Sequence, residues 1–293
     1  MKLPKITNKQ QDIIKLLYRY RFLNRIQIQL LMNHKDKRRT ISWLKDLRDK
    51  DYVNWIYSTD FTEKSKPAIY YIGINGVRYL KTVKWDNDGT LAPFYPLEEV
   101  RKCYKDNERS QTFIERSILI ADCCLTLEAI NATDSGVGNN GTKSNVSYTY
   151  LTEADYIDPD SEYYFLAEHE TLRPNLLIIK QKGRTTTNYL LEVFDSTLPR
   201  YRLRYRLKAY FTYIDDGEWE YATGDDSPPT VLLVCPNLVD LIYAKRRTKK
   251  LITGIYDDEA PENIHIRFTM TEKLQEHGVT AEIWEEGRQA LSL

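Results

Sequence analysis

Residues 23–57, LNRIQIQLLMNHKDKRRTISWLKDLRDKDYVNWIY, combine two short helical patterns with a strand that follows them directly. Asn24 can cap a first helix through Met32, and a second helix is predicted over 36–50 after a polar turn. The apolar residues that are spaced three apart in this second helix, and are expected to form its buried side, are Ile41, Leu44 and Leu47. The stretch therefore predicts a helix-turn-helix that leads into a β-strand over 52–57.

The sequence on either side extends this pattern. An amphipathic helix is predicted over 9–20, before the quoted stretch. After it, a polar loop over 58–67 leads to a returning strand over 68–72, which predicts a hairpin with a basic tip. Three helices followed by such a hairpin, or wing, are typical of a winged helix-turn-helix, which we predict for residues 1–85.

Charge is distributed unevenly along the chain. The formal net charge is zero, with 42 Lys and Arg against 42 Asp and Glu. Residues 1–90 hold 19 of the basic and 9 of the acidic residues, so the remaining residues hold 23 basic and 33 acidic ones. A basic N-terminal part joined to an acidic remainder predicts a phosphate-binding domain followed by a second domain. The alternative is chance clustering of solvated surface charge.

The helix predicted over 36–50 fits the width of the major groove of duplex DNA, so we expect it to be the reading helix. Lys and Arg neutralise phosphates, Arg also reads guanine, and Ser and Thr hydrogen-bond to bases or to the DNA backbone. The residues expected to contact DNA are Lys35, Lys37, Arg38, Arg39, Thr40, Ser42, Lys45 and Arg48 at this helix, and Lys64 and Lys66 on the wing. Double-stranded DNA is therefore the expected partner, and a homodimer is expected because such domains often read paired half-sites. The alternative is a winged helix that contacts another protein.

The rest of the chain predicts a second domain after a linker. Pro93 and Pro96 lie in a loop-like stretch over 86–107, and a long helix is predicted over 108–130. Beyond it, strands are expected over 172–180, 187–195, 230–235 and 264–270, and helices over 200–213, 237–251 and 271–277. This order predicts a domain of the α/β or α+β class, built on a mixed sheet, over 108–293.

One spacing in the second domain is typical of metal-dependent nucleases of the PD-(D/E)xK type. Such an enzyme needs an acid at the end of one strand, and a second acid followed by a lysine on the next strand, to bind a divalent metal and activate water. Here Asn175 occupies the first acid position, Glu192 the second, 17 residues later, and Phe194 the lysine position. The residues of a nuclease alternative, which would use Mg²⁺ or Mn²⁺, are Glu192, Asp195, Glu115 and Lys208. Outside this alternative we expect no metal and no other cofactor.

Several short stretches carry a further resemblance: 23–53, 149–153 (TYLTE), 173–176 (RPNL), 190–195 (LLEVFD), 204–210 (RYRLKAY), 268–271 (FTMT) and 282–284 (EIW). Together they resemble the replication-relaxation family of plasmids and conjugative elements. The resemblance implies an N-terminal winged helix joined to a restriction-endonuclease-like domain. It also implies a DNA-binding role in plasmid replication and DNA relaxation, or in its control, with other replication or mobilisation proteins as partners.

The usual Pro-Asp of that family is Pro174-Asn175 in this chain. The resemblance therefore implies a catalytically degraded nuclease-like domain that serves as an assembly platform. A further alternative is a transcription regulator whose second domain senses a peptide, a protein or a small ligand.

A second basic run lies on the helix predicted over 200–213. Its members are Arg200, Arg202, Arg204, Arg206 and Lys208, three of which recur at i, i+4 spacing. We interpret these residues either as partners of the domain's acids or as a second DNA contact. Tyr201 and Tyr205, which lie among them, are predicted to be packing residues.

The remaining composition bears on the compartment. The four cysteines, which show no CxxC spacing, are Cys103, Cys123, Cys124 and Cys235. We expect them to be buried, reduced thiols of a cytoplasmic protein. No run approaches ~18 consecutive apolar residues, so no membrane segment is expected.

Overall fold

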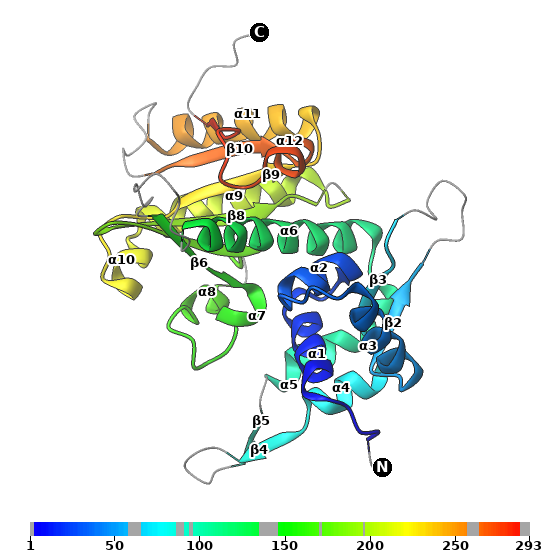
Figure 1. Cartoon of the computed structure of the whole chain (residues 1–293). Helices are drawn as coiled ribbons and strands as arrows, with labels where there is room; N and C mark the ends of the chain where they lie inside the picture. Colours follow the sequence, from blue (N-terminus) through cyan, green and yellow to red (C-terminus); the bar gives the residue numbers. More distant parts are fainter. Residues whose placement is uncertain are drawn as a thin grey trace. The chain divides into compact units, whose positions relative to one another are not determined.

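The computed structural model describes residues 3–57, 66–85, 91–93, 96–134, 146–169, 172–195, 197–256 and 264–287. The chain divides into two compact units, Met1–Ala121 and Asp122–Leu293 (Figure 1). Each unit has its own sheet and its own core.

Unit 1 begins with three helices and a small antiparallel sheet (Figure 1). Its first elements are α1 (Asn8–Tyr20), β1 (Leu23–Asn24), α2 (Arg25–Leu31), α3 (Lys37–Asp49), β2 (Val53–Ile56) and β3 (Ile69–Ile72). The strand order is β1-β3-β2, and β2 pairs with β3 from Val53↔Ile72 to Ile56↔Ile69. The three predicted helices and the predicted hairpin are therefore present, and the two-residue strand β1 adds to them. The predicted basic tip of the hairpin, with Lys64, lies outside the described residues.

Side-chain caps explain where these three helices begin. Thr7 and Asn24 each form a capping box with a glutamine three residues later, at the start of α1 and α2. Asp36 caps α3, because its Oδ1 accepts from the backbone nitrogens of Arg38 at 2.8 Å and Arg39 at 3.3 Å. The caps satisfy amide groups that would otherwise have no intrahelical partner.

The buried side of α3 differs from the predicted one. Thr40, expected to contact DNA, is 1% exposed, and its hydroxyl donates to the carbonyl oxygen of Asp36. Ile41, expected in the core, is 44% exposed. At ~100° per residue, the i, i+4, i+7 spacing of Thr40, Leu44 and Leu47 keeps to one side of a helix, whereas steps of three residues drift by ~60° each time. The predictions for Thr40 and Ile41 are therefore wrong.

The rest of unit 1 extends beyond residue 85, where we predicted the first domain to end. It contains α4 (Ile74–Leu80), β4 (Val83–Trp85), β5 (Leu91–Pro93), α5 (Leu97–Lys102), the 3-10 helix η1 (Cys103–Glu108) and the start of α6 (Gln111–Asp134). The stretch predicted as a linker thus includes α5 and most of η1. Asp106 of η1 is 1% exposed and forms an ion pair with Arg21. Gln27 of α2 donates to the carbonyl oxygen of Ile118 at 2.9 Å, so α6 begins as part of unit 1.

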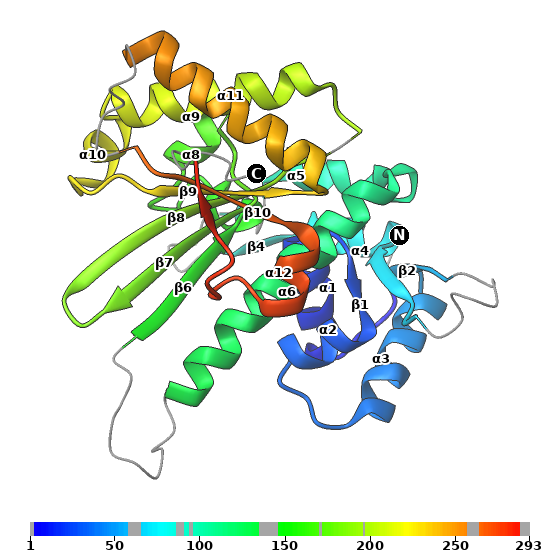
Figure 2. The same cartoon turned by 90° about the horizontal axis from the view of Figure 1, so that it is seen from above.

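Unit 2 is built on a six-stranded mixed sheet with the order β11-β10-β9-β8-β7-β6 (Figure 2). Its strands are β6 (Val146–Thr152), β7 (Leu176–Lys182), β8 (Thr185–Val193), β9 (Thr230–Cys235), β10 (Ile266–Met270) and β11 (Glu285–Glu286). β6, β7 and β8 are antiparallel neighbours, β8, β9 and β10 are parallel, and β11 is antiparallel to β10. The predicted mixed α/β sheet is confirmed, although β6 and β11 were not predicted.

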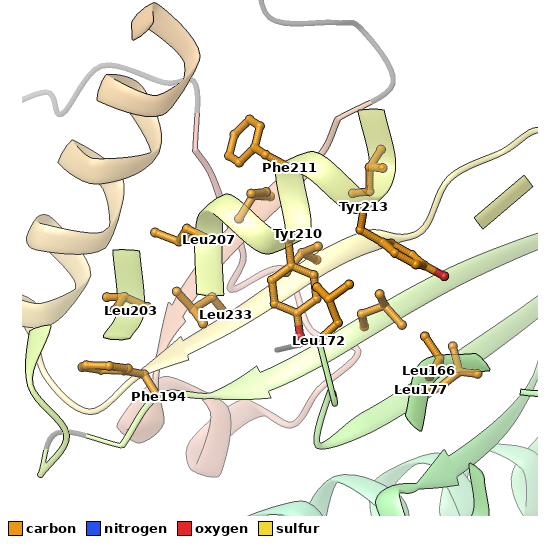
Figure 3. Close-up of a cluster of buried hydrophobic side chains, with 14 of the residues drawn as sticks. Leu166, Leu172, Leu177, Phe194, Leu203, Leu207, Tyr210, Phe211, Tyr213 and Leu233 are labelled. Atoms are coloured by element: carbon orange, nitrogen blue, oxygen red, sulfur yellow. The ribbon is translucent and has the colours of Figure 1, made fainter. Parts of the chain in front are cut away.

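Helices cover both faces of this sheet (Figure 2). Unit 2 contains α7 (Glu153–Tyr156), α8 (Phe165–Glu168), α9 (Arg200–Asp215), α10 (Glu218–Thr223), α11 (Leu238–Tyr256) and α12 (Thr271–His277). α9 and α11 lie on one face, and α12 and the C-terminal part of α6 lie on the other. Side chains of α9, among them Leu203, Leu207 and Tyr210, point toward the sheet and form its core with Leu177 and Leu233 (Figure 3). This contact fixes which side of α9 is buried.

Two further predictions concern features of the whole chain. All four cysteines are buried thiols outside any disulfide, as predicted. Burial raises the pKa of the Cys103 thiol to about 11, and that of Cys123 and Cys235 to about 12. In the part of the chain that the structure describes, no helix combines the length and the apolar character needed to cross a membrane.

The tight packing of α4 against β2 can be tested at Gly76. A Cβ atom there would press against the carbonyl oxygen of Tyr52 and lie 2.8 Å from Ile72 Cγ2. We expect Gly76→Ala to lower the free energy of unfolding by about 1–3 kcal/mol, because overpacking forces the backbone to shift. Urea unfolding followed by tryptophan fluorescence measures the change. The matched control is Gly254→Ala on α11, where an added Cβ would meet open space and a helical alanine is expected to stabilise by up to ~1 kcal/mol. Equal effects of the two changes would contradict the packing described.

The ion pairs of β11 predict a pH dependence. Glu285 accepts from Lys245 Nζ at 2.6 Å and from Lys273 Nζ at 3.2 Å, and the hydrogen bond from Lys245 is the main reason why the pKa of Glu285 lies below its usual value. A carboxyl whose pKa is lowered on folding stabilises the fold at neutral pH and loses this effect as the pH falls through its folded-state pKa. We therefore expect Glu285→Gln to destabilise at pH 7, and the difference from wild type to shrink below pH ~4. Chemical unfolding at each pH measures it, with Glu282→Gln as the exposed neighbouring control. A difference that stays constant with pH would contradict this account.

Candidate nucleic-acid interface

The first turn of α3 presents three consecutive cations to solvent. Lys37, Arg38 and Arg39 are exposed, and none of them is paired with a carboxylate among the described residues. The positive end of a helix dipole disfavours cations by about 0.3–1 kcal/mol each. Helix stability therefore does not account for their position, whereas an anion approaching this end would be held by side chains and dipole together.

Further predicted DNA contacts continue along one face of α3. Arg38, Ser42 and Lys45 follow the i, i+4, i+7 spacing of a single helix face, and all three are exposed. Arg48 is half-buried, and its guanidinium lies 4.4 Å from the centre of the Trp55 ring and 3.3 Å from Asp49 Oδ1. Of the other predicted contacts, Lys35 and Lys66 are exposed, Thr40 is buried, and Lys64 lies outside the described residues.

Two aromatic residues that the sequence reasoning missed extend this surface onto β2. Trp55 and Tyr57 are 43% and 47% exposed, and their rings stack at 5.7 Å with an interplanar angle of 18°. The contact of Trp55 with Arg48 joins them to α3. The i, i+2 spacing of two aromatics next to a polar loop was the available signal. We call Arg38, Ser42, Lys45, Arg48, Trp55 and Tyr57 the α3–β2 surface.

Glu192, the predicted acid of the nuclease alternative, forms a buried ion pair in unit 2. Glu192 of β8 is 8% exposed and faces α9. Arg206 Nε donates to Glu192 Oε1, and Arg206 Nη2 donates to Glu192 Oε2, both at 2.7 Å. Tyr210 adds a hydrogen bond from its hydroxyl to Oε2 at 2.6 Å. Both carboxylate oxygens of Glu192 are thus satisfied by α9, in the bidentate geometry that makes arginine–carboxylate pairs strong.

The electrostatics of this cluster favour the charged pair. Burial alone would lower the pKa of Arg206, but attraction to Glu192 and the hydrogen bonds between them outweigh burial and raise it. Burial, followed by the Glu192 charge, raises the pKa of Tyr210 well above its usual value, so its hydroxyl stays protonated and donates. The cluster is therefore a fixed structural contact at neutral pH.

The residues around Glu192 are likewise engaged in structural hydrogen bonds. Asn175 Oδ1 accepts from the backbone nitrogen of Val193 at 2.8 Å, and the Asn175 backbone nitrogen donates to the carbonyl oxygen of Leu191 at 2.9 Å. Asp195 Oδ1 accepts from the backbone and the hydroxyl of Thr197, just before α9. The asparagine at the first acid position thus continues the β7–β8 pairing.

The other residues of the nuclease alternative do not join this cluster within unit 2. Lys208 is exposed on α9, whereas Arg206 on the buried side of the helix is the cation that reaches Glu192. Glu115 belongs to unit 1, where it accepts from Gln111 at 2.9 Å. Among the described residues there is no group of three or more His, Cys, Asp and Glu side chains that could hold a metal ion.

Comparisons with known proteins add little to this geometry. No protein-family model matches the chain, and no curated protein matches it. A solved structure of the restriction endonuclease FokI matches with a TM-score of 0.27 and 11% sequence identity, over 93% of this chain and 46% of that chain. The chain thus spans about half the length of that enzyme. A TM-score this low assigns neither a fold nor an activity.

The structural role of the Glu192 cluster can be tested by removing its cation. Arg206→Met leaves Glu192 buried without a positive partner, and we expect the free energy of unfolding to fall by about 3 kcal/mol. Urea unfolding measures the change, with Arg204→Met on the exposed side of α9 as control, which is expected to change stability by less than ~0.5 kcal/mol.

A double-mutant cycle separates the pair from its parts. In Glu192→Gln with Arg206→Met the buried charge is gone and Tyr210 keeps an acceptor, so the double variant is expected to lose less stability than the sum of the two single variants. Strict additivity would show that the two side chains do not interact.

Proposed function

We propose that the chain binds double-stranded DNA through the α3–β2 surface, with α3 in the major groove and the β2–β3 hairpin against the flanking backbone. In this proposal unit 1 acts as a winged helix. The observation that carries it is the set of exposed cations on α3 without carboxylate partners among the described residues, at the helix end where an anion is favoured. Lys and Arg at these positions neutralise phosphates, and Arg38 and Ser42 are placed to reach base edges.

The role of the stacked aromatics in this proposal is to position α3. The Trp55 ring holds the Arg48 guanidinium at the rim of the helix, where it can meet a phosphate beside the groove. The same contact couples the hairpin to α3, so that both elements approach DNA as one rigid surface. Lys66 at the base of the returning strand adds a cation on the hairpin side.

The proposal extends to the biological setting through the sequence motifs that resemble the replication-relaxation family. We propose a role in replication or relaxation of plasmid or other mobile-element DNA, with unit 2 as an assembly platform in a homodimer. The engagement of both Glu192 oxygens by Arg206 and Tyr210 supports a non-catalytic unit 2. A metal ion at Glu192 would have to displace this buried pair.

The DNA-binding proposal is tested by Arg38→Ala with Arg39→Ala in the full chain. Fluorescence anisotropy of a labelled duplex, titrated over a range of salt concentrations, is expected to show weaker binding. The slope of log K against log salt should be smaller by about 1 for each lost phosphate contact. The matched control, Arg101→Ala with Lys102→Ala, removes the same charge from exposed positions of α5 and is expected to leave the slope unchanged. If both double variants behave alike, α3 is not the reading helix.

The nuclease alternative has a separate test. Incubation of the protein with supercoiled plasmid and Mg²⁺ or Mn²⁺, with Glu192→Gln beside the wild type, shows whether Glu192 supports cleavage. Under the proposal, neither protein nicks the plasmid. Nicking by the wild type that is lost in Glu192→Gln would establish the enzyme and overturn the assembly role.

A further inference from the structure

The solvent side of α9 alternates aromatic and basic residues. Tyr201, Arg204, Tyr205 and Lys208 follow the i, i+3, i+4, i+7 spacing of one helix face, opposite the side chains that point into the core (Figure 3). We call these four residues the α9 face. Tyr201 and Tyr205 are 55% and 67% exposed, so their predicted packing role is wrong. Their rings meet each other edge to face at 6.1 Å and leave broad surfaces open to solvent.

The basic residues of α9 differ in whether a carboxylate lies beside them. Arg206 binds Glu192, and Arg200 lies 3.4 Å from Asp240. Within the described part of unit 2, Arg204 and Lys208 are exposed and paired with no carboxylate, and the same is true of Arg202 beside them. Of the two interpretations that the sequence left open, ion pairing thus accounts for Arg200 and Arg206 but not for the rest.

The order of charges along α9 is opposite to the order that stabilises a helix. Basic residues crowd its first half, from Arg200 to Lys208, and its last turn ends at Asp215, followed by Asp216. The first turn contains no acid and the last turn no base. A helix dipole favours acids in the first turn and bases in the last turn, so Arg200 and Arg202 in the first turn of α9 are held against the dipole. A bound anion would offset this unfavourable interaction between the cations and the dipole.

A neighbouring helix continues the positive surface. The Tyr243 ring of α11 lies 5.2 Å from the Arg200 guanidinium and 5.0 Å from that of Arg247, and its hydroxyl donates to the carbonyl oxygen of Arg200 at 3.3 Å. α9 and α11 lie side by side on one face of the sheet (Figure 2). Further along α11 after Tyr243, three more basic residues are exposed: Arg246, Lys249 and Lys250.

We propose that the α9 face, together with Arg202 beside it, binds single-stranded nucleic acid, with bases stacked on Tyr201 and Tyr205 and phosphates held by Arg202, Arg204 and Lys208. Aromatic rings interleaved with cations match the alternation of base and phosphate in an unpaired strand. In a duplex the base faces are stacked on one another, so exposed tyrosine rings have no base to receive there. Protein interfaces are depleted of lysine, so Lys208, which has no carboxylate partner in the described part of unit 2, fits a phosphate better than a protein surface. The inference concerns unit 2 alone and does not depend on duplex binding by α3.

The test uses the full chain carrying Arg38→Ala and Arg39→Ala, so that α3 contributes little. Fluorescence anisotropy with fluorescein-labelled oligothymidylate and oligouridylate measures binding, and the tighter ligand identifies the preferred sugar. Tyr201→Ala with Tyr205→Ala is expected to weaken binding about 20-fold or more, since each stacked base loses its platform. Tyr201→Phe with Tyr205→Phe keeps both rings and is expected to bind within about twofold of the parent. Tyr221→Ala, at a 92% exposed tyrosine of α10, is the matched control and should leave binding unchanged.

Charge provides an independent measurement on the same protein. Arg204→Gln with Lys208→Gln is expected to reduce the slope of log K against log salt by about 1.4, because each single-strand phosphate contact contributes ~0.7. Folding of each variant is checked by circular dichroism, and all changed side chains are exposed.

Four results of the binding measurements overturn the proposal. They are no binding of either oligonucleotide by the parent, equal binding by the alanine and Tyr221 variants, a phenylalanine variant as weak as the alanine variant, and an unchanged salt slope after the charge removal. A shift from dimer to monomer in the alanine variant with oligonucleotide binding intact would also overturn it, and would assign the α9 face to self-association instead.

Discussion

The buried ion pair between Glu192 and Arg206 is the constraint on which the arrangement of unit 2 depends. A carboxylate on the inner face of a central strand is tolerated only if a cation and further donors reach it, since an unpaired buried charge is strongly destabilising. Arg206 and Tyr210, one turn apart on α9, supply these donors. Because both must face β8, the rotation of α9 about its axis is fixed. The residues on its opposite side are then necessarily turned to solvent.

Charged side chains are arranged differently in the two units. In unit 1, buried Asp106 binds Arg21, and exposed cations collect on α3. In unit 2, acidic residues outnumber basic ones, and some of the acids form ion pairs within the unit, as Glu285 does with Lys245 and Lys273. The net charge of zero is thus the sum of a basic and an acidic part of the chain.

Much of the fold follows from the sequence, because its helices and buried strands have clear periodicity. The strand over 230–235 and the helix over 271–277 agree with the structure residue for residue. The sequence of β6, VSYTYLT, alternates as a half-buried strand does, so the signal for it was available. The two-residue β11 is defined by its pairing with β10 and is too short to show a period. Residue roles were harder to predict. Ile41 was expected in the core and Thr40 on the surface, but the structure has them the other way round, because the buried side of α3 lies one residue away from the predicted side. Tyr201 and Tyr205 were assigned to packing, although an aromatic side chain alone does not say which side of a helix is buried.

The burial of all four thiols protects them from reagents as long as the chain is folded. A thiol reagent attacks through the thiolate, and with pKa values of about 11 for Cys103 and about 12 for Cys123 and Cys235 almost none is present in the folded chain at neutral pH. Alkylation therefore has to wait for local or global opening of the structure. Cys103 lies in unit 1, and Cys123, Cys124 and Cys235 lie in unit 2. The rate at which each thiol is alkylated therefore reports how often its own unit opens.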